Sequence, residues 1–191
     1  MKGAKDIVVM VLAAGEGRRF GGIKQLAPID GTPMIRHVLL NLQCPDVYNL
    51  VVVLGAYRYQ LIAVIRDLDL EICENEEWER GLSSSIMTGL TFIGEKFPET
   101  RAVIIALGDQ WKLEASHLLQ LIRSSEENPD KIIAVAYGKD PGVPALFPKS
   151  TWALLETLQG DQGAKEVLRS RTDVVLVDLP EAALDLDTKE D

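Results

Sequence analysis

Six short runs of apolar, mostly β-branched residues recur along the chain, and segments with helical spacing separate them. The runs are DIVVMVL, NLVVVLG, DLEIC, RAVIIALG, KIIAVAYG and DVVLVDL. A strand that is apolar at almost every position is buried on both faces, which is typical of parallel strands joined by helices. The sequence therefore predicts an α/β fold, a three-layer α/β/α sandwich around a mainly parallel, doubly wound, Rossmann-like sheet.

Size and charge limit what such a fold can bind. With 191 residues and 47% hydrophobic content, we expect a single domain over residues 1–191. No apolar segment approaches the roughly 20 residues that span a bilayer, and the first residues indicate a strand, so we expect a cytoplasmic protein. A net charge of −9 argues against nucleic acid or an anionic membrane as a partner. Cys44 and Cys73 lack the spacing of a disulfide framework or a zinc site.

A glycine-rich, cationic loop follows the first apolar run, in the stretch LAAGEGRRFGGIKQL. A dinucleotide fingerprint would need glycine where Phe20 stands, and a P-loop would need lysine where Ile23 stands. Glycines still let backbone N–H groups approach an anion, and cationic side chains complement its charge. These residues are Gly15, Gly17, Gly21, Gly22, Arg19 and Lys24. The loop is interpreted as a phosphate site, and a solvated surface loop is the alternative.

Carboxylates follow two other predicted strands. Asp109 comes directly after AVIIALG, and Asp185 and Asp187 stand near the end of the chain. Taken singly, Asp109 is better explained as a helix cap, and an acidic tail as a solvated one. A triphosphate and two aspartates together carry about six negative charges, of which Arg19 and Lys24 offset about two. The remaining charge of about −4 favours a bound Mg²⁺ ion.

Two further segments stand out. Ser83 or Ser84 can cap a helix whose Ile86, Leu90 and Ile93 form an apolar stripe. Three consecutive serines exceed what a cap needs, so we expect them to face polar groups of a ligand. The stretch GKDPGVPALF is interpreted as a shaped loop that lines a pocket, with an ordinary turn as the equal alternative.

These segments together resemble the MobA-like nucleotidyltransferases, which have a glycosyltransferase-A-like fold. LAAGEGRRFGGIK is similar to their signature LAAG-x-x-x-R-x-G-x-x-K. GLSSSI, LGDQ, GVPALF, GDQGAK and DLDTKED follow in the order found in molybdenum-cofactor cytidylyltransferases, so the resemblance covers nearly the whole chain.

The resemblance implies a site and a reaction. Arg19, Lys24 and Asp109 would be catalytic, and Asp109 and Asp187 would bind Mg²⁺. The nucleotide would lie on Leu12, Ala13, Ala14, Gly15, Gly17, Arg19, Lys24, Ser83, Ser84, Ser85 and Gly108. The implied activity is transfer of CMP from CTP to a phosphate monoester such as molybdopterin, with release of pyrophosphate. The implied partners are CTP, the phosphorylated acceptor and a molybdoenzyme maturation protein.

Departures from the family pattern leave the acceptor open. Trp111 and Lys189 stand where these relatives have proline, and Trp111 would reshape the acceptor side. Ala14, where guanylyl-transferring relatives tend to have glycine, favours CTP over GTP. The alternatives are a GTP-using or sugar-phosphate or alcohol-phosphate nucleotidyltransferase, and a non-catalytic module that binds a nucleotide to deliver a cofactor or to regulate a partner.

Overall fold

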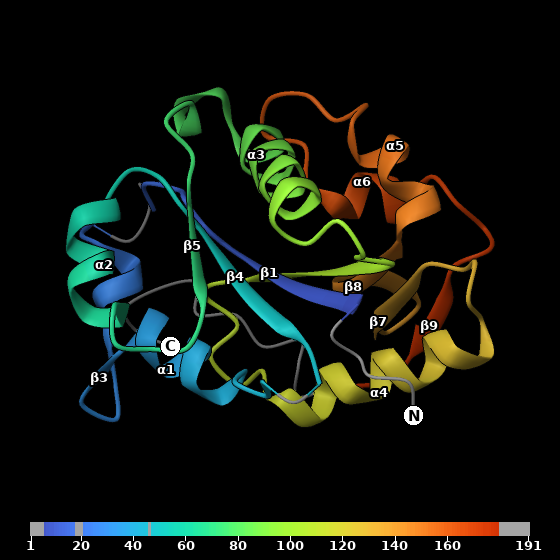
Figure 1. Cartoon of the computed structure of the whole chain (residues 1–191), viewed down its shortest axis with the longest axis horizontal. Helices are drawn as coiled ribbons and strands as arrows, with labels where there is room; N and C mark the ends of the chain where they lie inside the picture. Colours follow the sequence, from blue (N-terminus) through green and yellow to red (C-terminus); the bar gives the residue numbers. More distant parts are fainter. Residues whose placement is uncertain (1–5, 18–20, 46, 180–191) are drawn as a thin grey trace.

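A seven-stranded sheet forms the centre of the molecule (Figure 1). The computed structural model describes residues 6–17, 21–45 and 47–179. The strand order is β5-β4-β1-β6-β8-β7-β9, and every neighbouring pair is parallel except the two that involve β8. The prediction of a mainly parallel α/β fold is confirmed. The strands are β1 (Ile7–Ala13), β4 (Asn49–Leu54), β5 (Glu71–Glu74), β6 (Ala102–Leu107), β7 (Ile133–Tyr137), β8 (Asp140–Pro148) and β9 (Val175–Val177).

Helices cover both faces of the sheet, as Figure 1 shows. Successive side chains of a strand point to opposite faces, so β1 sends Val9 and Val11 into one core and Val8 and Met10 into the other. The first core is closed by α1 (Met34–Asn41), α2 (Arg58–Ile65) and α4 (Ala115–Glu127). The second core is closed by α3 (Leu82–Lys96), α5 (Trp152–Leu155) and α6 (Ala164–Arg169).

The segment GKDPGVPALF forms a turn at its first two residues, and from Asp140 onward it forms β8 and not the loop that we predicted. β8 runs antiparallel to both β6 and β7, between which it lies. A register shift occurs opposite Ala134 and Val135, so Val143 and Pro144 fall between two stretches of regular pairing. Proline lacks a backbone donor and is tolerated at such a bulge, which explains why a proline-rich stretch can still lie inside the sheet.

Short elements complete the chain. A two-stranded ribbon lies outside the main sheet, and single turns of 3-10 helix join larger elements. They are η3 (Lys24–Leu26), β2 (Pro28–Ile29), β3 (Thr32–Pro33), η4 (Trp78–Arg80) and η5 (Lys149–Thr151). In the part of the chain that the structure describes, no helix combines the length and apolar character of a membrane span.

Candidate functional site

The glycine-rich loop leaves β1 at the carboxyl edge of the sheet, where ligands bind in open α/β folds. The carbonyl of Ala14 accepts a hydrogen bond from the backbone N–H of Ala56 at 3.0 Å, which fixes the loop to the end of β4. The side chain of Gln25 donates to the carbonyl of Gly15 at 2.8 Å. Two anchors, one beyond β4 and one in η3, therefore hold the start of the loop in place.

Glycine is required in this loop at one position and leaves open space at another. Gly17 has a φ of +64°, a left-handed conformation that a larger residue adopts only with strain, and a Cβ there would lie 3.3 Å from the Cβ of Lys24. At Gly15, nothing lies within 4 Å of where a Cβ would be. The backbone at Gly15 is thus open to a ligand, as a phosphate site requires.

Lys24 and Asp109 form an ion pair across the carboxyl edge. The Nζ of Lys24 donates to Oδ2 of Asp109 at 2.8 Å, and the two side chains are 15% and 29% exposed. The other carboxylate oxygen, Oδ1 of Asp109, is buried and has no hydrogen-bond partner among the described residues. A buried oxygen without a partner is costly, so this atom marks a place where a further positive group fits.

The position of Asp109 follows from Gly108. The backbone N–H of Gly108 donates to the carbonyl of Leu12 at 2.9 Å, and a Cβ at Gly108 would lie 2.9 Å from that of Ala13. The turn after β6 therefore lies directly against the end of β1. The helix-cap explanation of Asp109 does not hold, because α4 begins at Ala115 with Glu114 at its N-cap.

Among the described residues, Asp109 is the carboxylate that this site offers to a divalent cation. No group of three or more His, Cys, Asp or Glu side chains suited to a metal occurs within the described ranges. The buried, unpaired Oδ1 of Asp109 is a suitable oxygen ligand for Mg²⁺ or Mn²⁺. The predicted second ligand Asp187, its neighbour Asp185, the predicted phosphate ligand Arg19 and the family departure Lys189 lie outside the described residues.

A second wall of the site comes from the serine-rich start of α3. Asn75, which is 1% exposed, follows β5 and donates from Nδ2 to the hydroxyl oxygens of Ser84 at 2.9 Å and Ser85 at 3.0 Å. Its Oδ1 accepts from the backbone N–H of Glu77 at 3.0 Å. The Ser83 hydroxyl has no such partner among the described residues. Of the three serines, Ser83 therefore has the hydroxyl best placed to accept a new contact.

The turn of the GDQGAK segment packs on this wall. Gly81, at the N-cap of α3, has a φ of +96°, and a Cβ there would lie 2.4 Å from the carbonyl of Gly160. The backbone N–H of Ser83 donates to the same carbonyl at 3.0 Å. The prediction that Ser83 or Ser84 caps α3 was wrong, because a glycine takes the N-cap position and no side chain caps the helix.

Trp111 follows the aspartate turn. Its side chain packs partly buried against the core that α1, α2 and α4 cover, and the Nζ of Lys112 lies 4.8 Å from the centre of its ring. An aromatic side chain thus stands two residues after Asp109, at Trp111, and a cation three residues after it, at Lys112.

Three buried amides of the site escaped sequence reasoning: Gln25, Asn75 and Gln110, which are 8%, 1% and 0% exposed. Each is a polar residue next to a loop that the sequence did single out. Their closeness in sequence to a predicted ligand loop was the one signal that could have identified them. Only the fold shows that these side chains point inward.

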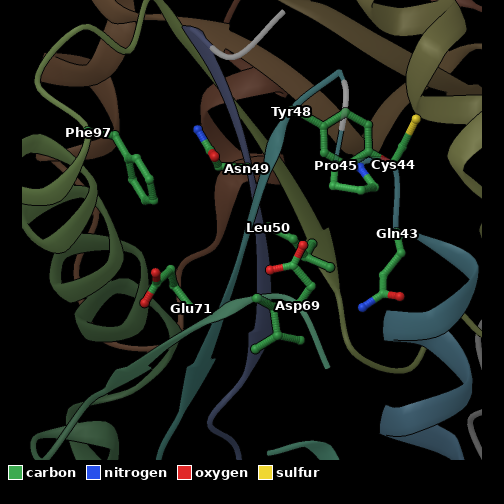
Figure 2. A pocket seen from close by; sticks show the side chains of 10 residues that line it. Gln43, Cys44, Pro45, Tyr48, Asn49, Leu50, Asp69, Glu71 and Phe97 are labelled. Carbon is green, nitrogen blue, oxygen red and sulfur yellow. The ribbon is translucent and has the colours of Figure 1, made fainter. Parts of the chain in front are cut away.

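A pocket of about 320 Å³ lies at the opposite end of the sheet, and Figure 2 shows its lining. Asn49 and Glu71, which are the first residues of β4 and β5, line it together with Tyr48 and Asp69. It therefore opens at the amino ends of these strands, away from the glycine-rich loop and Asp109.

Comparison with known proteins agrees with this geometry. The profile of the MobA-like NTP transferase domain matches residues 9–175. Nicotine blue oxidoreductase of Paenarthrobacter nicotinovorans is 28% identical over a 193-residue alignment that covers 95% of this chain and 92% of that protein. The crystal structure of a homologue of Mycobacterium tuberculosis Rv0371c, from Mycobacterium sp. strain JC1, superposes with a TM-score of 0.82 at 28% identity, covering 97% of this chain and 92% of the other.

Two more distant structures share the fold. Molybdopterin-guanine dinucleotide biosynthesis protein A from Archaeoglobus fulgidus has a TM-score of 0.71 at 20% identity and covers 96% of this chain and 93% of its own. Rv0371c from M. tuberculosis in complex with manganese has a TM-score of 0.72 at 22% identity and covers 91% of this chain and 88% of its own.

The fold and the site define an α/β nucleotide-binding protein of the nucleotidyltransferase class. A mainly parallel sheet carries, at its carboxyl edge, a glycine-rich loop, a lysine and a carboxylate with a buried unpaired oxygen. With the profile matching most of its length, the chain belongs to the MobA-like NTP transferase family.

Proposed function

We propose that this protein transfers CMP from CTP to a phosphate monoester acceptor of the molybdopterin type, with Mg²⁺ as cofactor and release of pyrophosphate. The observation that carries the proposal is the pairing of Lys24 with Asp109 beside the open backbone of Gly15. This arrangement supplies one phosphate-binding cation, one metal-binding carboxylate and one approachable backbone segment within a single edge of the sheet.

The chemistry needs no side-chain nucleophile. The acceptor phosphate is already anionic at neutral pH, so one of its oxygens attacks the α-phosphorus of CTP in line. A new bond forms between that oxygen and the α-phosphorus, and the bond to the bridging oxygen of the β-phosphate breaks. Pyrophosphate leaves with the electron pair. Catalysis is then a matter of positioning and of stabilising negative charge.

The proposed role of each site residue follows from the chemistry of its side chain. Lys24 and Arg19 would bind the triphosphate and offset the charge that develops on the leaving pyrophosphate. Asp109 and Asp187 would hold Mg²⁺, which when bound neutralises phosphate oxygens and lowers the barrier to their approach. Ser83 and the backbone near Gly108 would contact the nucleoside, with Ser84 and Ser85 held by Asn75.

The selection of CTP is the finer part of the proposal. Ala14 stands where guanylyl-transferring relatives tend to have glycine, and it is 4% exposed, with its methyl group facing Gly55 after β4. We infer from this residue choice a preference for the pyrimidine of CTP over the purine of GTP. The manganese complex of the fold relative is in keeping with a divalent metal at such a site.

A second candidate comes from the relative that aligns with almost the whole chain, which is an oxidoreductase by name. In that case the glycine-rich loop would bind a nucleotide that carries electrons, and Lys24 would still meet its phosphates. The two candidates differ in product, because only nucleotidyl transfer releases pyrophosphate.

The test is a screen of pyrophosphate release with CTP, GTP, ATP and UTP against molybdopterin, sugar phosphates and alcohol phosphates, with and without Mg²⁺. We expect turnover with CTP and molybdopterin that depends on Mg²⁺. Asp109→Asn should lower kcat by at least about 100-fold, the scale of losing one transition-state stabiliser.

Other outcomes redirect the assignment. Full turnover by Asp109→Asn at saturating Mg²⁺ would remove the proposed role of that carboxylate. Turnover with GTP alone would overturn the choice of CTP. Binding of CTP without pyrophosphate release from any acceptor would favour a delivery or regulatory module, and oxidation of a reduced pyridine nucleotide by a dye substrate would favour the oxidoreductase.

A further inference from the structure

Gln110 is the residue directly after the proposed metal ligand, and it is completely buried. Its side chain and its backbone both bond to Leu107. The backbone N–H of Gln110 donates to the carbonyl of Leu107 at 3.3 Å, and the Oε1 of Gln110 accepts from the backbone N–H of Leu107 at 2.9 Å. Gln110 therefore closes a four-residue turn in which Gly108 and Asp109 are the central residues.

The other end of the Gln110 amide reaches a different strand pair. Its Nε2 donates to the carbonyl of Val143 at 2.9 Å and to the hydroxyl of Tyr137 at 3.3 Å. The Tyr137 hydroxyl donates in turn to the carbonyl of Val143. Gly142 leaves room for the Tyr137 ring, since a Cβ there would lie 2.4 Å from it. The amide thus ties the Asp109 turn to the β7–β8 hairpin, which lies beside β6 in the sheet (Figure 1).

Asp109 itself has little to hold its carboxylate in place. Among the groups described, Oδ2 contacts only the ammonium group of Lys24, and Oδ1 has no partner there. The direction of the carboxylate is consequently set by the backbone of the turn. That backbone is closed by the two bonds between Gln110 and Leu107.

We propose that Gln110 is a positioning residue for the metal site, which aims the Asp109 carboxylate by closing its turn and fixes that turn to the β7–β8 hairpin through Tyr137 and Val143. This inference rests on the proposed function for Asp109 as a metal ligand. A residue that supports a ligand from behind has a measurable effect on metal affinity, commonly about 10-fold to 100-fold.

The experiment uses the full chain and Mn²⁺ alone as the probe, followed by electron paramagnetic resonance of free Mn²⁺. Gln110→Met keeps the length of the side chain but removes its donor and its acceptor. We expect the Kd for Mn²⁺ to rise by about 10-fold or more. Tyr137→Phe removes one hydroxyl at the far end of the network, and we expect a smaller rise of a few fold.

The matched control is Tyr48→Phe. Tyr48 is also buried, and its hydroxyl also donates to a backbone carbonyl, that of Leu42 at 2.5 Å. It lies at the amino end of β4, against the pocket of Figure 2, and so has no connection with Asp109. We expect Tyr48→Phe to lower the melting temperature as Tyr137→Phe does, and to leave the Kd for Mn²⁺ unchanged.

The outcomes distinguish failure of the role of Gln110 from failure of the proposed metal-binding role of Asp109. If the wild-type protein and Asp109→Asn bind Mn²⁺ equally, the metal assignment of Asp109 fails and the inference fails with it. If Asp109→Asn loses Mn²⁺ while a folded Gln110→Met stays within about twofold of wild type, Asp109 stands and the role of Gln110 is refuted. Should Gln110→Met not fold, equal Mn²⁺ affinities of Tyr137→Phe and Tyr48→Phe would refute the coupling.

Discussion

At the scale of single residues, the proposed function would give Lys24 two tasks that oppose each other. Its ammonium group lies 2.8 Å from Oδ2 of Asp109 and offsets the charge of that carboxylate. A metal ion on Asp109 would have to accept a positive neighbour or displace it, because like charges at this distance repel. An incoming triphosphate offers Lys24 another anionic partner. Binding of nucleotide and binding of metal should therefore favour each other.

Replacing Lys24 by methionine separates these tasks. Without nucleotide, Lys24→Met should tighten Mn²⁺ binding by about tenfold, since a competing positive charge worth about 1.4 kcal/mol is gone. The same variant should weaken CTP binding by a similar factor, because a phosphate ligand is lost. Titrations of Mn²⁺ and of CTP measure the two effects.

The control is Lys131→Met, which breaks an exposed ion pair with Asp173 at 3.4 Å. We expect it to change neither affinity. If Lys24→Met weakened Mn²⁺ binding in the absence of nucleotide, Lys24 would be a support of the metal site and not a competitor.

At the scale of elements, the start of α3 depends on a residue outside the helix. Asn75 lies at the end of β5 and bonds to Ser84, Ser85 and the backbone of Glu77. Its own backbone N–H donates to the carbonyl of Leu54 at 2.8 Å. One buried amide therefore sets how the first turn of α3 is placed over the ends of β4 and β5.

Asn75→Ala should destabilise this junction. It leaves one buried and one partly buried serine hydroxyl and one backbone N–H with fewer partners, and we expect a loss of about 1–3 kcal/mol in the free energy of unfolding. CTP affinity should fall as well, because the first turn of α3 no longer has a fixed position. Urea denaturation and CTP titration measure the two quantities.

Ser125→Ala provides the comparison. Ser125 is 1% exposed in α4, and its hydroxyl donates to the carbonyl of Ile122 at 2.7 Å. We expect this variant to lose some stability and to keep its CTP affinity. Equal CTP affinities of Asn75→Ala and Ser125→Ala would show that the Asn75 network does not support the nucleotide site.

At the scale of the whole molecule, burial changes how the protein responds to alkaline solution. Cys73 is 2% exposed in the core beneath α3, and burial raises the pKa of its thiol from 9.0 to about 11, with a smaller contribution from the charge of Glu74. Burial also raises the pKa of Tyr48, well above its usual value. Both groups stay protonated to a higher pH in the folded state than in the unfolded state.

Stability should accordingly fall at high pH. For Cys73 the folded pKa is the higher one, so its contribution is complete below about pH 9 and is lost as the pH rises toward 11. We expect the free energy of unfolding to drop by on the order of 1 kcal/mol from this thiol between pH 9 and 10.5. Urea denaturation at several pH values measures the slope. In Cys73→Ala the slope should be shallower, and an unchanged slope would rule out the thiol as its cause.

Most strands of the central sheet could be predicted because short stretches of sequence specify them. Runs that are apolar at nearly every position became β1, β4, β6 and β7, which are mostly buried. The runs DLEIC and DVVLVDL became the edge strands β5 and β9, which are partly exposed. The stripe of Ile86, Leu90 and Ile93 is buried in α3 as predicted. The glycine-rich loop after β1 also followed from the sequence, because positive φ and close approach restrict residue choice within a few positions.

Other features were decided only when the chain folded. The antiparallel placement of β8 between β6 and β7 depends on pairing over long separations, and its prolines locally argue against a strand. The contact of Lys24 with Asp109 joins residues 85 positions apart. The inward direction of Asn75 and Gln110 has no periodic signal, because a single buried amide is identified by its partners. The sequence by itself thus determined most strands and helices and the place of the glycine-rich loop, and tertiary packing determined the antiparallel strand β8 and which side chains meet.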